Sequence, residues 1–269
     1  MSAPKTAYNI IILGVIFSLI YSRSFTPIAV FEGFALALFL AWFISKLDLD
    51  SRSAFALTWF ALFIIGEFNN MLEAYFFTTV YNTAGSLANG LIKPLITTFL
   101  ESAFAVLLLR PKGNRDIAAA LKSYLRLRTA GSWVWRMIAA SVLYLVVYFI
   151  FGLIVSSYVM PYYSDASSGL VIPPLPTLVV LEIFRGFIYA VVLLFVFAGI
   201  KREKNMDFWV ASALLYIPGA FLPLLSSIAS LSVISSVAPF HLVELLADSM
   251  VYGYLASRLV GAGKIKPRK

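Results

Sequence analysis

Eight long apolar runs constrain this chain more than any other feature of its sequence. They cover roughly residues 7–22, 26–45, 54–79, 87–109, 133–158, 176–200, 207–228 and 239–260. An α-helix needs about 20 apolar residues to cross the hydrocarbon core of a bilayer. Its backbone N–H and C=O groups are hydrogen-bonded within the helix, as an environment without water requires. We therefore predict an all-α polytopic membrane protein, with about eight transmembrane helices in a single integral domain over residues 1–269.

The composition excludes several other classes of protein. Hydrophobic residues make up 61% of the chain and charged residues 13%, which leaves too little polar surface for a soluble protein of this size. The absence of cysteine excludes disulfides, thiolate chemistry and cysteine-liganded metals. The first residues lack the small-residue exit site of a cleavable signal, so we expect the first run to be retained as a helix.

The basic residues indicate how the chain is oriented. They concentrate after the second, fourth, sixth and eighth runs, at Lys46, Arg52, Arg110, Lys112, Arg115, Lys122, Arg126, Arg128, Lys201, Arg202, Lys204, Lys264, Lys266, Arg268 and Lys269. The alternate connectors hold only Arg23 and Asp165. This alternation is typical of eight helices with both termini cytoplasmic. The net charge of +8 thus reflects topology in a cell membrane, and we predict no nucleic-acid partner.

The connectors divide the chain into four parts. Four helices (1–110) precede a basic cytoplasmic connector (111–132), and four more (133–262) precede a basic tail (263–269). Within the connector, residues 117–127 are amphipathic, and we expect them to lie along anionic lipid headgroups. The outer connector at 159–175 is a plain loop or a lid over an outward cavity, and we expect the plain loop. Prolines at 218 and 223 predict a kink in the seventh run.

Matching positions in the two halves indicate a 4+4 parallel repeat, with chance similarity as the alternative. The second and sixth runs both begin with proline, place Glu32 or Glu182 within two turns, and end on lysine. The fourth and eighth runs each carry a cation, a nearby proline and then an acid two turns on. Such repeats are common in membrane transporters.

Ionisable and amide side chains from five runs fall at similar depth in the membrane, at 1.5 Å per helical residue. They are Glu32, Glu67, Asn70, Glu73, Lys93, Glu182, Arg185, His241 and Glu244, with Glu101 and Asp248 nearer the centre. Buried charges of this kind usually face a bundle interior or a hydrated cavity. We therefore predict one polar cavity that opens away from the cytoplasm, with these residues as candidates for binding a substrate or protons.

Simpler interpretations of the same residues stay open. Glu182 and Arg185, at i and i+3, can neutralise each other and hold helices together. Asn70 can serve only interhelical hydrogen bonding, and His241 and Glu244 can form a structural hydrogen bond. The carboxyls outnumber the cations, so some are protonated or a cation binds among them. If a metal bound, His241 and Glu244 would be its ligands, but a single histidine with carboxylates is a poor zinc set. We predict no cofactor.

Two resemblances involve these residues. Pro-Phe-His241-Leu-Val-Glu244, Asn-Asn-Met-Leu-Glu73 and Arg185-Gly186 resemble a widespread group of uncharacterised prokaryotic multi-pass membrane proteins, which implies a membrane fold but no activity. Glu182-Ile-Phe-Arg185 resembles the CAAX-protease and bacteriocin-processing family, whose pattern has adjacent glutamates before an arginine and two separate histidine motifs. This chain has one glutamate at shorter spacing and one histidine, so the catalytic set of that family is not carried over.

Three functions follow as alternatives. The first is a transporter or permease whose acidic cavity takes a cationic or polar solute, or protons. The second is a non-catalytic assembly or accessory subunit, in which the buried charges only fix helix packing. The third is an intramembrane enzyme acting on a lipid-linked or membrane-embedded substrate. We favour the transporter. Whether the chain is an enzyme, which substrate it takes and whether it forms oligomers are left open by the sequence.

Overall fold

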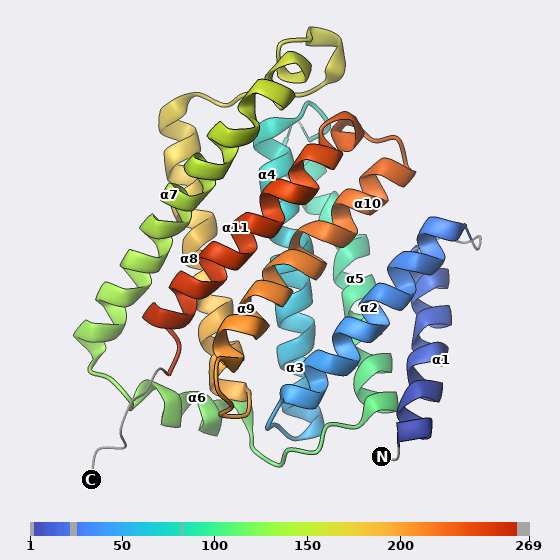
Figure 1. Cartoon of the computed structure of the whole chain (residues 1–269), viewed down its shortest axis with the longest axis vertical. Coiled ribbons are helices and arrows are strands. Elements are labelled where there is room, and N and C mark those ends of the chain that lie inside the picture. Colours follow the sequence, from blue (N-terminus) through green and yellow to red (C-terminus); the bar gives the residue numbers. More distant parts are fainter. Residues whose placement is uncertain (1–2, 22–25, 82, 263–269) are drawn as a thin grey trace.

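The protein is an all-helical bundle in the computed structural model, which describes residues 3–21, 26–81 and 83–262 (Figure 1). The described residues contain no β-strand, only three isolated bridges between connectors. Arg23 and the basic tail at 263–269 lie outside the described residues.

Within the described residues, eight long helical segments, the short helix α6 and two short 3₁₀ helices make up the bundle. The first half consists of α1 (Ala3–Tyr21), α2 (Pro27–Lys46), α3 (Ser51–Ala61), η1 (Leu62–Phe68), α4 (Asn69–Phe77) and α5 (Ala84–Leu109). The short α6 (Ile117–Leu125) follows. The second half consists of α7 (Ala130–Tyr163), η2 (Ala166–Ser168), α8 (Leu175–Gly199), α9 (Met206–Tyr216), η3 (Ile217–Phe221), α10 (Leu222–Ala229), η4 (Val233–Ser236) and α11 (Ala238–Leu259).

Six of these segments are long and apolar enough to cross a membrane: α2, α3–η1–α4, α5, α7, α8 and α9–η3–α10. The apolar part of α1 is shorter, at Pro4–Ile20. The helix α11 has sufficient length but carries His241, Glu244 and Asp248, which lower its hydropathy. The prediction of a helical multi-pass membrane protein is confirmed, whereas the count of eight crossings stays a prediction.

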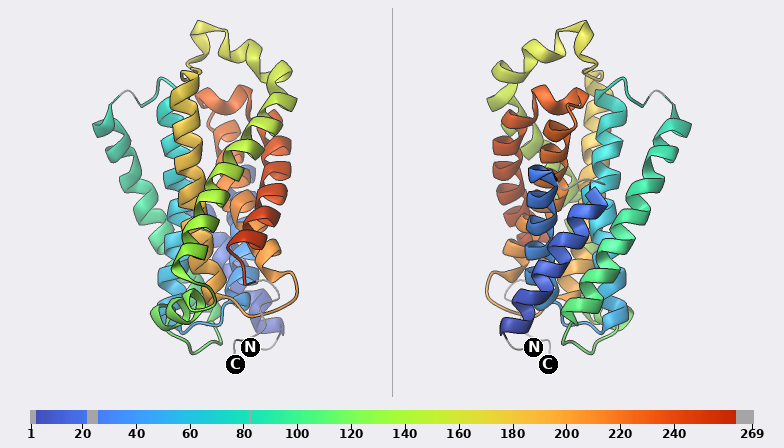
Figure 2. Two further views of the ribbon diagram at one scale, coloured as in Figure 1. Left: turned by 90° about the vertical axis from the view of Figure 1, so that its left-hand side faces the viewer. Right: turned by 90° about the vertical axis from the view of Figure 1, so that its right-hand side faces the viewer.

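Consecutive long segments run in opposite directions, so alternate connectors meet at one end of the bundle (Figures 1 and 2). At this end, which we call the basic end, Leu47 pairs with Ile200 and Leu49 pairs with Arg115. Lys46 also forms an ion pair of 3.1 Å with Glu203. The start of α1 and the end of α11 lie here too. The opposite end, the far end, holds the connectors near residues 78–81, 164–174 and 230–237.

Local sequence explains where the helices begin. Asp50, Asp116 and Thr129 each accept a hydrogen bond from the backbone N–H three residues later and so cap the first turn of the next helix. At the far end, Thr26 caps α2 ahead of Pro27, a residue suited to the first helical position because it has no N–H to satisfy.

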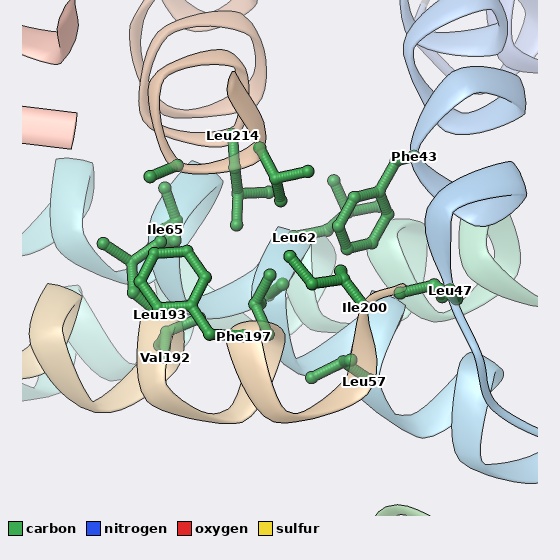
Figure 3. Packing of buried hydrophobic residues seen from close by; sticks show 14 of the residues in the cluster. Phe43, Leu47, Leu57, Leu62, Ile65, Val192, Leu193, Phe197, Ile200 and Leu214 are labelled. Carbon is green, nitrogen blue, oxygen red and sulfur yellow. The ribbon is translucent and has the colours of Figure 1, made fainter. Parts of the chain in front are cut away.

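A continuous apolar core fills the basic half of the bundle. Figure 3 shows its centre, where side chains from α2, α3, η1, α8 and α9 interlock; they include Phe43, Leu57, Leu62, Ile65, Val192, Leu193, Phe197 and Leu214. Close packing of this kind leaves no room for water.

The predicted amphipathic stretch is a helix, α6, that packs on the basic end of the bundle. Ala120 and Tyr124 on its inner face are buried. The Tyr124 hydroxyl donates a 2.6 Å hydrogen bond to the carbonyl of Val260, and burial raises the pKa of this phenol above its usual range. The apolar face of α6 is thus covered by protein, and contact of its outer face with lipid headgroups stays a prediction.

Two π-helical segments interrupt the third and seventh long segments and lie against each other. One is η3, at the proline-rich kink predicted from the sequence, and the other is η1, which the sequence did not indicate. The Asn70 side-chain amide donates to the carbonyl of Gly66, at 2.8 Å, and to that of Gly219, at 2.7 Å. A Cβ atom on Gly66 would lie 3.0 Å from the Pro218 carbonyl oxygen. The absence of side chains on these glycines therefore permits the close contact of η1 with η3.

Candidate functional site

Arg185 on α8 is the centre of a buried hydrogen-bonded cluster. Its Nη1 donates to both carboxylate oxygens of Glu182, at 3.0 and 2.9 Å, one turn earlier on the same helix. Its Nη2 donates to Glu73 at 2.6 Å, and its Nε donates to the side-chain oxygen of Asn69 at 2.9 Å. Asn69 and Glu73 lie one turn apart on α4, so they face α8 together. The planar guanidinium fork suits such multiple contacts better than a lysine amine would.

His241 and Glu244 form a second pair, one turn apart at the far end of α11. The His241 Nδ1 lies 2.5 Å from the Glu244 carboxylate. Glu244 is buried, and a Cβ atom on Gly152 of α7 would lie 3.6 Å from its other oxygen. Gly152 of α7 thus lies beside the carboxylate, between the two helices.

Asp248 lies one turn deeper on α11 and is also buried. Its Oδ1 has no hydrogen-bond partner among the described residues. The side chain lines a recess of about 30 Å³, together with Glu73 and Arg185. An unsatisfied buried carboxylate oxygen is costly, so this recess is a place where a donor group or a cation would be stabilised.

Three tyrosines close the cluster toward the basic end. Tyr144 contacts the rings of Tyr189 and Tyr252 edge-to-face, at centroid separations of 5.0 Å each. The Tyr252 hydroxyl donates to the carbonyl of Gly186 at 3.2 Å. A Cβ atom on Gly186 would lie only 2.6 Å from that of Tyr144, so glycine is required for α7 to approach α8 here. These rings separate the polar cluster from the apolar core.

A cavity of about 330 Å³ opens above the cluster, and we call it the site cavity. Asn70, Glu73, His241 and Glu244 line it together with aromatic and aliphatic side chains of α4, α7, α8 and α10. Its volume falls within the range typical of small-molecule sites, roughly 300–1,000 Å³. Four candidate residues from two helices distant in sequence thus share one wall.

The connector between α7 and α8 covers the far end of this cavity. The Val171 N–H donates to the Phe77 carbonyl at 2.8 Å, and the Thr79 N–H donates to the Gly169 carbonyl at 2.9 Å. Leu170 packs with residues of α7, η4 and α11 and lines the cavity. The connector, which we expected to be a plain loop, therefore forms part of the cavity wall.

A second cavity, of about 340 Å³, lies on the opposite face of α4. Glu67, Glu101 and Thr98 line it, with serines of α10. Asn70 lines both cavities, so the broken helices α3–η1–α4 and α9–η3–α10 form the partition between them.

The structure divides what the sequence predicted as one shared cavity. Glu73, Asn70, Glu182, Arg185, His241, Glu244 and Asp248 come together on α4, α8 and α11, whereas Glu67 belongs to the second cavity. Glu32 is buried on α2 and lines neither cavity, and its Oε1 has no partner among the described residues. Lys93 is exposed on α5 and lines neither cavity. The outer half of α5 leans away from the bundle (Figure 2), which removes Lys93 from the centre.

Some residues of the site carried no clear sequence signal. Tyr144, Tyr189 and Tyr252 look like any aromatic residues of an apolar helix. Asn69 could have been selected with Glu73, since the two residues are four apart and share a helical face. Cross-helix contacts of this kind depend on the rotation of each helix, which hydropathy does not specify.

The site carries an excess of acid. Four carboxyl groups (Glu73, Glu182, Glu244 and Asp248) surround the guanidinium of Arg185 and the imidazole of His241, and both of these are already paired. Within the described ranges, no three His, Cys, Asp or Glu side chains gather closely enough to hold a metal ion. The remaining acidic capacity suits an ammonium group or a proton.

Comparison of the chain with protein-family models, with curated proteins and with solved structures gives no match.

Proposed function

We propose that this protein is a carrier of the cell membrane whose acidic site binds a cationic or polar solute, or protons. The observation that carries the proposal is the site cavity beneath the far end, which Glu73 and Glu244 line while the nearby basic side chains are already paired with carboxylates. Charges that served only helix packing would not need a cavity of this size beside them.

The proposed topology has eight crossings and both termini in the cytoplasm. The eight long segments alternate in direction (Figure 1), and the basic connectors lie together at one end. Both observations support this topology. In this orientation the site cavity lies toward the outside, and the basic end contacts anionic headgroups of the inner leaflet. The helix α11 then crosses the membrane with its polar face turned toward the site.

A parallel repeat of four helices is part of the proposal. The third segment of each half contains a π-helical break, η1 or η3, and the two breaks are in contact. Broken helices near the bilayer centre are typical of transporters that work by alternating access, and π-helical segments often occur at functional sites. Because the apolar core closes the basic half, passage inward requires movement at these breaks.

The carrier function is tested with purified protein in proteoliposomes that contain a pH-sensitive dye. Ethylammonium and other small ammonium ions are added outside, and we expect a change of internal pH that Glu73→Gln abolishes. Glu203→Gln is the matched control, because Glu203 pairs with Lys46 at the basic end and touches neither cavity. The proposal is wrong if no cation moves protons, or if both variants behave like the original protein.

A second candidate function is an intramembrane enzyme acting on a membrane-embedded substrate. The observation in its favour is the close pair of His241 and Glu244 beside Glu73, an arrangement suited to general acid–base work. It predicts that His241→Ala abolishes turnover of such a substrate while solute movement is unchanged. The accessory-subunit alternative predicts instead that these substitutions alter only stability.

A further inference from the structure

The mouth of the site cavity lies on the lipid-facing side of the bundle. Leu153 and Met160 of α7 line the cavity and yet are 71% and 42% exposed, and Ile172 of the connector is 49% exposed. On the α8 side, Leu178 completes the lining. All four side chains are apolar, which is unfavourable for an entrance used by a hydrated ion and favourable for one that faces lipid.

The arrangement of α7 and α8 explains this lateral opening. The two helices pack tightly at Gly186 and Tyr144 and separate toward the far end, where the connector joins them (Figure 2). With 34 residues, α7 is about 51 Å long at 1.5 Å per residue, so it must tilt or project beyond a hydrocarbon core of about 30 Å. Leu153 lies in the far half of α7.

Two other sides of the cavity are covered. The connector is hydrogen-bonded to Phe77 at the end of α4 and to Thr79 just beyond it. Between α7 and α11, the ring of Phe240 lies 5.6 Å from that of Tyr158 and stacks on it. The exposed apolar lining at Leu153, Met160 and Ile172 points to the gap between α7 and α8 as the open side.

The inner end of the cavity has the opposite chemistry. Glu73 and Glu244 lie in its wall, and beyond them Asp248 lines the recess that Glu73 also borders. The cavity therefore has an apolar half that opens to lipid and an anionic half that is closed by the tyrosines. Such a polarity matches a molecule with a hydrocarbon chain and a positive head.

We propose that the site cavity binds an amphiphilic alkylammonium compound that enters sideways from the outer leaflet between α7 and α8. The ammonium group lies between Glu73 and Glu244, and the alkyl chain lies along Phe149, Leu153 and their aromatic neighbours. This inference rests on the proposed function, in that it specifies which class of cationic solute the carrier takes.

The natural absence of cysteine allows a clean test with single-cysteine variants in lipid nanodiscs. Leu153→Cys is reacted with a bulky maleimide to obstruct the entrance. Ile154→Cys, treated identically, is the matched control, because Ile154 is an equally lipid-exposed neighbour that does not line the cavity. Equilibrium binding of radiolabelled dodecylammonium is measured against empty nanodiscs, with ethylammonium and dodecanol as probes that lack the chain or the charge.

Labelled Leu153→Cys is expected to lose dodecylammonium binding, and labelled Ile154→Cys is expected to keep it. Glu73→Gln and Glu244→Gln should each weaken binding about tenfold or more through loss of a charge-assisted contact. Both acids are tested because Glu73 also holds Arg185, and thermal unfolding identifies any variant that fails to fold. Dodecanol and ethylammonium should bind more weakly than dodecylammonium.

The other outcomes separate the inference from the function on which it rests. Equal binding by the two labelled variants overturns the lateral entrance, and the cationic site stands if the glutamate variants still weaken binding. Ethylammonium that binds as tightly as dodecylammonium overturns the amphiphile and leaves the carrier intact. Failure of both ammonium probes to bind removes the inference and the proposed cationic solute together.

Discussion

Arg185 illustrates how a guanidinium is accommodated inside an apolar bundle. Removing a charge from water costs several kcal/mol, which is offset only by good geometry and saturated hydrogen bonding. Here three nitrogens donate to Glu182, Glu73 and Asn69. One cation thus serves two carboxylates, and Glu73 belongs to both the ion-pair cluster and the cavity wall.

Replacing Arg185 should destabilise the protein strongly. Arg185→Met leaves Glu182 buried without its partner, and breaking a buried pair in this way costs about 3–5 kcal/mol. Arg115→Met is the matched control, because the 3.5 Å pair of Arg115 with Asp48 is partly exposed and such pairs contribute about 0–1 kcal/mol. The free energy of unfolding in detergent distinguishes them, and equal losses would show that the cluster at Arg185 is not a stabilising centre.

At the scale of elements, the two π-helical segments form a joint between the halves of the bundle. A π-turn changes the rotation of the helix beyond it, and here it places Asn69 and Glu73 toward α8 while Glu67 faces the other cavity. Asn70 secures the joint by bonding to one carbonyl of its own helix and one of η3. The joint is also the partition between the two cavities.

Asn70→Leu should loosen this joint. Loss of two hydrogen bonds to buried carbonyls predicts a destabilisation of about 1–3 kcal/mol and faster amide hydrogen exchange over residues 217–221. Asn9→Leu provides a matched comparison, since Asn9 donates a single 2.7 Å bond to the Leu108 carbonyl, between α1 and α5. Exchange at 217–221 that is unchanged in Asn70→Leu, or altered equally in Asn9→Leu, would contradict the role of the joint.

The whole molecule is asymmetric along its long axis. The basic half contains a continuous apolar core, and its connectors are paired with one another. The far half contains both cavities and the separated outer ends of α5 and α7 (Figure 2). Local stability follows packing, and elements with fewer buried contacts open at lower free energy. Movement that exposes the site is therefore expected in the far half and at the η1–η3 joint.

The eight-crossing topology is tested by labelling single cysteines in intact cells with a membrane-impermeant maleimide. Ala166→Cys and Leu231→Cys, exposed in two far-end connectors, should react from outside. Lys204→Cys, exposed at the basic end, should react only after the membrane is permeabilised. Reaction of Lys204→Cys in intact cells would reverse the orientation. Opposite results at the two far-end positions would require a different number of crossings.

Hydropathy determined the helical segments because a bilayer demands about 20 consecutive apolar residues, and this demand is local in sequence. Every predicted run became a helix whose bounds differ by a few residues, and the basic connectors meet at one end as their alternation indicated. The pairs Glu182–Arg185 and His241–Glu244 were also readable, since residues three apart on a helix are neighbours.

Only the tertiary structure decided which of the buried charges meet. Glu73 and Arg185 are far apart in sequence, and their contact depends on the tilt and rotation of α4 and α8, which η1 changes. For the same reason Glu32 and Lys93 lie outside the site cavity, although the sequence placed them at the same membrane depth as the other candidates. Glu67 faces the second cavity. Depth in a membrane follows from position along a helix, whereas convergence requires each helix to be rotated correctly by packing against its neighbours.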